Sequence, residues 1–414
     1  MNINSNRLWS SLMDLAQIGA TPKGGVRRLA LSELDGQARD LFIRWCKEAG
    51  CTVTIDGIGN IFARRPGKDD SLPPIITGSH IDTQPSGGKF DGNYGVMSGL
   101  EVVRTLNDNR VQTQAPIEIA VWTNEEGSRF TPVMMGSGLF IGAFELEHTL
   151  QQKDLDGISV GDALNRIGYA GPTKIGGRPV GAYFEAHIEQ GPILEDTKRV
   201  LGVVTGALGL RWYDAVVTGQ DAHAGPTPMR LRHDAMVAAA KMVAEINALA
   251  YRYQPDGRGT VGFMQVKPNS RNVIPGEVRF SVDLRHAEDA QLEKMEAEMR
   301  AKCAELAQAQ SVEVAIERVA NYPACRFDES CVAAVRDAAQ KLGLTHMDIV
   351  SGAGHDACYV SRVAPTAMIF VPCEGGLSHN ELENARPDEI AAGASVLINA
   401  MVAAAVVAGQ AQPA

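Results

Sequence analysis

Two patterns of hydrophobic and polar positions divide the chain. In the first part, apolar residues recur at helical spacing or gather in short runs typical of strands. These features predict helices at 32–49 and 95–106 and strands at 52–55, 61–64, 74–77 and 117–122. The same style returns near the end, with a helix at 328–342, a buried strand at 367–371 and an alanine-rich helix at 387–408. Strands that alternate with helices predict an α/β sheet domain.

The middle of the chain follows another order, in which a strand and a helix are followed by two strands, a helix and a strand. The ranges are 211–218, 233–250, 260–266, 278–283, 287–309 and 311–319. This βαββαβ order is that of a ferredoxin-like unit. The sequence therefore predicts an α/β domain in two segments, 1–209 and 328–414, interrupted by an inserted domain at 210–327.

Composition narrows the class of protein. The chain has 414 residues, with 39 Lys and Arg against 49 Asp and Glu, a net charge of −10 that argues against a nucleic-acid binder. Its seven cysteines include no CxxC pair, which favours a reduced, cytoplasmic location. We expect no signal peptide. We also expect no membrane attachment, since we expect no segment to have the roughly 18 uncharged apolar residues that are needed to span a bilayer.

Histidines and carboxylates recur in short, mostly glycine-bounded phrases, most of which follow predicted strands. The phrases are GSHIDT (78–83), GGKFDG (87–92), TNEEG (123–127), HIEQG (187–191) and SHNE (378–381). Any one of them is more often a turn or a surface charge pair, but their joint occurrence points to a metal site, because imidazoles and carboxylates bind ions such as Zn²⁺ and Mn²⁺. Asp82 is expected to accept the other ring N–H of His80 and so fix its tautomer.

Together with DAHAGPTPM (221–229), DLR (283–285) and GAGHDA (352–357), these phrases resemble the M20 metallopeptidase-like amidohydrolases. The resemblance is greatest to the hydantoinase/carbamoylase branch, which comprises N-carbamoyl-L-amino acid hydrolases, β-ureidopropionases and allantoate amidohydrolases. It extends from about residue 24 to residue 386. It implies a zinc-peptidase-like catalytic domain and an inserted ferredoxin-like domain that serves as dimerisation and lid domain.

The resemblance also implies the roles of the residues in these phrases. His80 and His187 would bind one divalent ion, Glu126 and His379 a second, and Asp91 would bridge both. The sequence does not choose between Zn²⁺ and Mn²⁺. Glu125, next to the implied ligand Glu126, is the expected general base.

Further residues are implied to recognise the substrate. His223 would stabilise the oxyanion in the active site of the partner subunit of a homodimer, and Asn272 is a second candidate to act across the interface. Arg285 would bind the carboxylate of the substrate. The remaining candidates for substrate binding are Gln190, Gly354 and His355. Other interpretations stay open, since DAHAGPTPM can be a capped turn, Arg285 can form a surface ion pair, and His355 with Asp356 can begin a helix.

The expected reaction is hydrolysis of an N-carbamoyl-L-amino acid or β-ureidopropionate to the amino acid, CO₂ and ammonia. Allantoate hydrolysis and an aminoacylase or dipeptidase activity of the wider M20 group are the alternatives. A non-catalytic relative with a relict site is less favoured, because both Glu125 and Glu126 are present.

Overall fold

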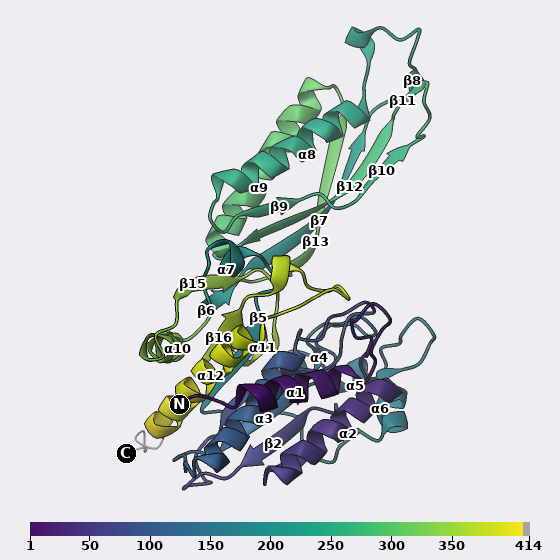
Figure 1. The fold of residues 1–414 in the computed structure, drawn as a ribbon. Helices are drawn as coiled ribbons and strands as arrows, with labels where there is room; N and C mark the ends of the chain where they lie inside the picture. Colours follow the sequence, from purple (N-terminus) through teal and green to yellow (C-terminus); the bar gives the residue numbers. More distant parts are fainter. Residues whose placement is uncertain (409–414) are drawn as a thin grey trace. The chain divides into compact units, whose positions relative to one another are not determined.

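The computed structural model describes residues 1–408, which divide into two compact units (Figure 1). The first unit combines Met1–Thr205 with the chain from Arg326 onward, and the second is Gly206–Cys325. Each unit has its own sheet.

The first unit is built on a nine-stranded sheet. The strands, in spatial order, are β1 (Thr52–Ile55), β2 (Ile61–Arg65), β4 (Ile117–Trp122), β3 (Ile75–His80), β5 (Ala182–Ile188), β16 (Thr366–Val371), β6 (Leu201–Ala207) and β14 (Cys325–Arg326), with β15 (His346–Ser351) also paired to β6. The four neighbours β4, β3, β5 and β16 run parallel, and all their residues are buried. A parallel sheet covered on both faces is expected to have such strands.

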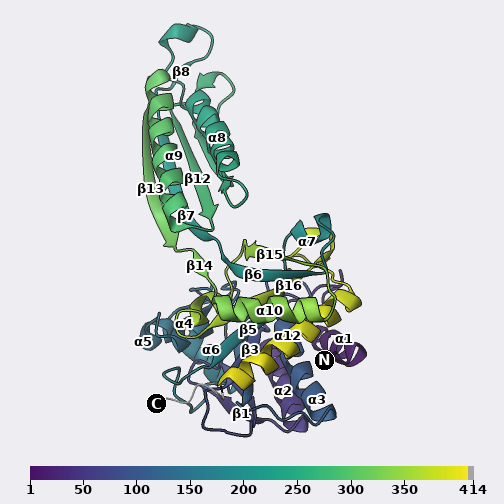
Figure 2. The ribbon, with the colours of Figure 1, turned by 90° about the vertical axis from the view of Figure 1, so that its left-hand side faces the viewer.

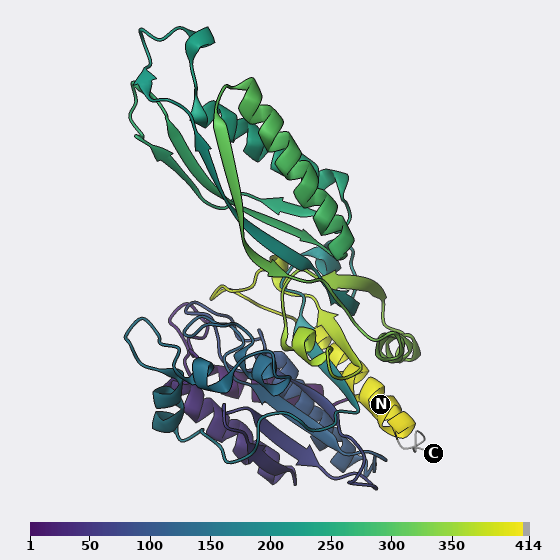
Figure 3. The same cartoon turned by 180° about the vertical axis from the view of Figure 1, so that it is seen from behind.

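Helices surround this sheet. The longer ones are α1 (Ser5–Ala16), α2 (Glu33–Glu48), α3 (Asn93–Asp108), α6 (Val160–Ile167), α10 (Glu329–Lys341) and α12 (Pro387–Ala408). The short ones are α4 (Met135–Phe140), α5 (Leu146–Leu150), α7 (Ile193–Asp196), α11 (Asp356–Val360) and the 3-10 turn η2 (Glu374–Gly376). The N-terminal amine lies beside α12, where it donates a hydrogen bond to Asn399 Oδ1 at 2.8 Å (Figure 3).

Helix α12 corrects one expectation. Its segment Pro387–Val406 has a mean hydropathy of 1.8 and is long and apolar enough to cross a membrane, so the judgement that no segment reaches that length is wrong. However, 56% of its most apolar 18-residue window is buried, and the helix packs against α3, α10 and β16. Its apolar composition is therefore that of a core helix.

The second unit has the predicted βαββαβ order. Its strands β10 (Met264–Lys267), β12 (Glu277–His286), β7 (Gly209–Thr218) and β13 (Glu313–Tyr322) form an antiparallel sheet in this order, and β9 (Arg258–Thr260) also pairs with β12. When the strands are numbered 1 to 4 along the chain, with β9 and β10 together as strand 2, their spatial order counted from β13 is 4-1-3-2. The expected single strand 260–266 is divided into β9 and β10.

Two long helices, α8 (Ala235–Arg252) and α9 (Asp289–Ala309), lie side by side on one face of this sheet (Figure 2). Alternate residues of β7, such as Tyr213, Ala215 and Val217, point into the core beneath the helices. Two short strands, β8 (Ala222–His223) and β11 (Val273–Ile274), pair as a separate two-stranded ribbon. The 3-10 turn η1 (Met229–Leu231) follows β8.

Candidate metal centre

The candidate ligands stand where parallel strands of the first unit end. His80 is the last residue of β3, which runs three residues beyond the predicted end at Thr77, and His187 is the penultimate residue of β5. Glu126 follows β4, and His379 follows β16. The carboxyl ends of parallel strands are the usual location of functional groups in α/β folds.

Asp91 is the centre of this cluster. Its Oδ1 lies 3.2 Å from Nε2 of His187 and 3.7 Å from Nε2 of His80. Its Oδ2 lies 3.2 Å from Nε2 of His379, which is itself 3.4 Å from Oε2 of Glu126. Among the described residues, three groups could hold a metal ion: His80–Asp91–His187 and Asp91–Glu126–His379, which share Asp91, and Glu185–His187–His355.

Backbone contacts orient the two buried imidazoles. Nδ1 of His80 faces the backbone oxygen of Asp82 at 2.9 Å, and Nδ1 of His187 faces the backbone oxygen of Ile188 at the same distance. A ring that donates through Nδ1 carries its lone pair on Nε2, the atom that faces Asp91. Gly92 has φ of 65°, and a Cβ atom there would lie 2.4 Å from the His80 ring, so only glycine allows this approach.

Asp82 acts differently from the prediction. Nδ1 of His80 contacts the backbone oxygen of Asp82 and not its carboxylate. The prediction that the carboxylate accepts this hydrogen bond is therefore wrong. The carboxylate instead accepts the backbone N–H groups of Glu125 and Glu126, each at 3.3 Å. Asp82 therefore positions both glutamates while its main chain orients His80.

The charges of the cluster favour cations. Burial raises the pKa of Glu126 to about 7 and that of Glu125 well above its usual value, although the charge of His80 opposes the shift. A hydrogen bond to Asp91 raises the pKa of His379 to about 9. Asp91, Glu125 and Glu126 each have close contacts with imidazole nitrogens, so carboxylate oxygens and imidazole nitrogens face one another in the cluster. This nitrogen and oxygen donor set fits divalent cations such as Zn²⁺ or Mn²⁺.

Glu125 belongs to none of the three metal-holding groups. Its Oε2 lies 3.5 Å from Nε2 of His80, and its side chain is 11% exposed. Its backbone oxygen accepts the N–H of Met134 at 2.7 Å. Glu125 is thus held beside the ligands, with its carboxylate facing the ring of His80.

Gln190 contacts the cluster directly. Its Nε2 donates to Oδ2 of Asp91 at 2.9 Å and lies 3.3 Å from Oγ of Ser378. Its Oε1 is buried and has no hydrogen-bond partner among the described residues. A buried acceptor without a donor is costly, so this oxygen is available to a ligand.

The helix interpretation of His355 is confirmed, because the residue directly precedes α11; its ring also packs against that of His187, with centroids 4.6 Å apart. Its Nε2 contacts Oγ of Ser351 at 2.9 Å, and burial keeps its pKa well below the usual value. Gly354 lies beside the side chain of Met134, which a Cβ atom at that position would approach to 3.2 Å.

Sequence reasoning missed two carboxylates next to the cluster. Glu185 lies two residues before His187 on β5 and accepts hydrogen bonds from Ser79 and from the N–H of Ala357. Glu383 accepts the N–H groups of Phe90 and Asp91. Glu185 could have been found from its spacing, because residues two apart on a strand share a face and Glu185 is two residues from His187. By contrast, nothing in the sequence links residue 383 to residue 91.

The remaining candidates belong to the second unit. His223 is exposed, and its Nδ1 accepts the N–H of Gly225 at 3.0 Å; it pairs with Val273 in the ribbon. Asn272 directly precedes β11, and its backbone oxygen accepts the N–H of Ala224 at 2.9 Å. Arg285, on β12, donates to the carboxylate of Asp283 at 2.8–3.2 Å. The ion pair envisaged for Arg285 is therefore present, and the structure describes these residues only within their own unit.

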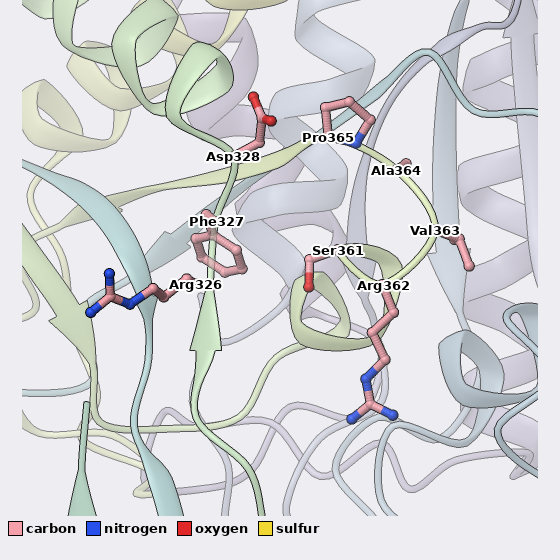
Figure 4. Close-up of a pocket in the computed structure, with 8 residues that line it drawn as sticks. All are labelled: Arg326, Phe327, Asp328, Ser361, Arg362, Val363, Ala364 and Pro365. Atoms are coloured by element: carbon pink, nitrogen blue, oxygen red, sulfur yellow. The ribbon is translucent and has the colours of Figure 1, made fainter. Parts of the chain in front are cut away.

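A surface hollow of about 440 Å³ in the first unit contains none of the candidate residues. It is lined by residues 326–328 and 361–365, including Arg326 and Arg362 (Figure 4). The metal-ligand cluster is elsewhere in the unit.

Comparison with known proteins identifies the family of the chain. Residues 76–403 match the model of peptidase family M20/M25/M40. The chain is 48% identical to an N-carbamoyl-L-amino-acid amidohydrolase of Rhizobium meliloti, over 97% of this chain and 96% of the relative. An allantoate amidohydrolase of Bacillus subtilis is 34% identical, over 91% of this chain and 92% of the relative.

A solved structure supports the same assignment. The crystal structure of an amidase of the hydantoinase/carbamoylase family from Burkholderia multivorans is 56% identical, with a TM-score of 0.96 and 98% coverage of both chains. The chain therefore belongs to peptidase family M20/M25/M40 and, within it, to the hydantoinase/carbamoylase amidases.

Proposed function

We propose that this protein is a metal-dependent amidohydrolase that converts an N-carbamoyl-L-amino acid and water into the amino acid, CO₂ and ammonia. The observation that carries the proposal is the pair of metal-holding groups that share Asp91, with Glu125 beside them. The relative from Rhizobium meliloti, named for this activity, supports the substrate class.

Two divalent ions, Zn²⁺ or Mn²⁺, would be held by His80, Asp91 and His187 on one side and by Asp91, Glu126 and His379 on the other. Such ions supply Lewis-acid polarisation of the ureido carbonyl and a more acidic water. The protein provides the ligands with fixed rotamers, since the imidazoles and the Asp91 loop are held by backbone hydrogen bonds.

Glu125 takes the proton of the attacking water and passes it to the leaving nitrogen. The raised pKa of this buried carboxyl group suits both steps, since a group that holds its proton more tightly is a stronger base. Asp82 supports Glu125 by accepting its backbone N–H.

His223 donates a hydrogen bond to the oxyanion. Its Nδ1 accepts the N–H of Gly225, so in the neutral ring the proton is on Nε2, which faces away from that contact and can donate. We place this donor, with Asn272 next to it, in the active site of the partner subunit of a homodimer, where the second unit serves as dimerisation and lid domain. A preorganised donor of this kind is worth about 2.7–4 kcal/mol.

The other candidates recognise the two polar ends of the substrate. Arg285 binds the carboxylate, for which its planar guanidinium is suited, and must then share or exchange its contact with Asp283. The unpaired Oε1 of Gln190 accepts a ureido N–H. Gly354 and His355 line the same site.

The alternatives are less well supported. Allantoate also carries ureido groups and a carboxylate, but the relative named for allantoate is 34% identical, against 48% for the N-carbamoyl-L-amino-acid amidohydrolase. An aminoacylase or dipeptidase would need a site for an acyl chain.

The absence of CxxC pairs supports a cytoplasmic location.

A substrate panel with controlled metal content tests the proposal. The protein is dialysed against chelator, reloaded with Zn²⁺ or Mn²⁺, and assayed for ammonia release from N-carbamoyl-L-amino acids, β-ureidopropionate and allantoate, and for amine release from N-acetyl amino acids. We expect activity to disappear without metal and to return most strongly on N-carbamoyl substrates. Full activity after exhaustive metal removal, or a preference for allantoate or acetyl substrates, would contradict it.

A further inference from the structure

Glu383 connects the two loops that carry candidate ligands from opposite ends of the chain. Its Oε1 accepts the N–H of Phe90 at 2.9 Å and that of Asp91 at 3.1 Å. Its Oε2 accepts the hydroxyl of Ser378 at 3.0 Å, and Ser378 directly precedes His379. The residue is 2% exposed, so the carboxylate is a buried link between the Asp91 loop and the His379 loop.

The loop at residue 88 is shaped around this carboxylate. A Cβ atom at Gly88 would lie 2.1 Å from Cδ and from Oε1 of Glu383, far inside van der Waals contact. Any side chain at position 88 would therefore displace the carboxylate. This gives a physical reason for a glycine at that position of the GGKFDG phrase.

The hydroxyl of Ser378 has one proton and two carboxylate oxygens within reach. These are Oε2 of Glu383 at 3.0 Å and Oδ2 of Asp91 at 3.3 Å. The shorter contact directs the proton to Glu383. Oδ2 of Asp91 faces His379 and already accepts a hydrogen bond from Nε2 of Gln190 at 2.9 Å, so without the Ser378 proton its second lone pair remains for a cation.

We propose that Glu383 is a positioning residue of the metal centre, which holds Asp91 by its backbone and draws the Ser378 proton away from the Asp91 oxygen that would bind the second ion. The inference rests on the proposed metal centre. Partners of this kind change metal affinity by about 10- to 100-fold when mutated.

The test compares Glu383→Gln with a matched control, Glu381→Gln. In Glu383→Gln the amide oxygen still accepts the two backbone N–H groups, whereas the amide NH₂ faces Ser378 and turns its proton toward Asp91. Glu381 lies two residues away and pairs with the exposed Lys23 at 3.6 Å, outside the cluster. Metal affinity is measured by competition with a chromophoric chelator for Zn²⁺ and for Mn²⁺, and circular dichroism checks the fold.

We expect the unsubstituted protein to bind two ions per chain, which tests the metal centre itself. Glu383→Gln should weaken one of them by about 10- to 100-fold, and Glu381→Gln should stay within about twofold, as expected for a partly exposed surface pair. In the double variant Glu383→Gln with Ser378→Ala, the misdirected proton is gone, so most of the lost affinity should return.

Two results would overturn the proposal while leaving the metal centre intact. One is a folded Glu383→Gln variant that binds both ions with unchanged affinity. The other is a double variant as weak as Glu383→Gln alone. If Glu383→Gln does not fold, Gly88→Ala replaces it, because the added methyl group displaces the same carboxylate; a folded Gly88→Ala protein with unchanged affinity would equally refute the role.

Discussion

The two units hold most of their candidate residues differently. In the first unit, four of the five candidate ligands, His80, Asp91, Glu126 and His187, are at most 9% exposed and come together from separate loops and strand ends, whereas the side chain of the fifth, His379, is 51% exposed. In the second unit, His223 is exposed, and its partner Gly225 is only two residues away; Arg285 pairs with Asp283 on its own strand.

This difference suits the two tasks that we propose for the units. Burial strengthens the electrostatic interactions of the cluster, because a low-dielectric surrounding screens charge poorly, and it keeps the four buried side chains rigid. A residue that must reach a substrate from a lid has to remain accessible until it closes. The comparison predicts that changes in the first unit affect metals or chemistry, and that changes in the second affect substrate recognition without loss of metal.

The largest expected effect is that of Glu125→Gln. The amide is nearly isosteric but cannot accept the water proton, so kcat should fall by at least about a thousandfold. Metal content measured by elemental analysis should stay at two ions. The neighbouring Glu126→Gln provides the contrast, since it should lose affinity for one ion; near-normal turnover in Glu125→Gln would remove it as the base.

His223→Ala should have the next largest effect. Loss of the oxyanion donor is expected to lower kcat by about a hundredfold or more, with both ions retained. His233→Ala, a substitution of another histidine in the same unit, should leave kcat within a few-fold. Loss of metal from His223→Ala would break the division of tasks between the units.

Arg285→Lys should have the smallest effect of the three. Lysine keeps the charge but loses the two-pronged contact, so KM for N-carbamoyl amino acids should rise by about tenfold with little change in kcat. Arg279→Lys on the same strand is the matched control, since Arg279 is 52% exposed and pairs with Glu277. An equal, small response of both variants would mean that Arg285 only forms its surface ion pair.

Much of the fold could be predicted from local pattern. The helices predicted at 32–49, 95–106 and 387–408 are confirmed as α2, α3 and α12, and the βαββαβ order of the second unit is confirmed as well. Strand β5 was not predicted, because Glu185 and His187 interrupt its apolar run. Those two residues are tolerated in a fully buried strand only because Ser79, Ala357 and Asp91 satisfy them from elsewhere.

The sequence by itself determined the alternation of elements, the residue types at the candidate site and the family resemblance, since these depend on local propensity, periodicity and motif spacing. Only the tertiary structure decided which atoms meet. It placed the backbone oxygen of Asp82 against His80, left Oε1 of Gln190 without a partner, and brought Glu383 to the N–H of Asp91 across 292 positions. Hydrogen bonds between such distant segments depend on the packing of the whole unit, which no local pattern encodes.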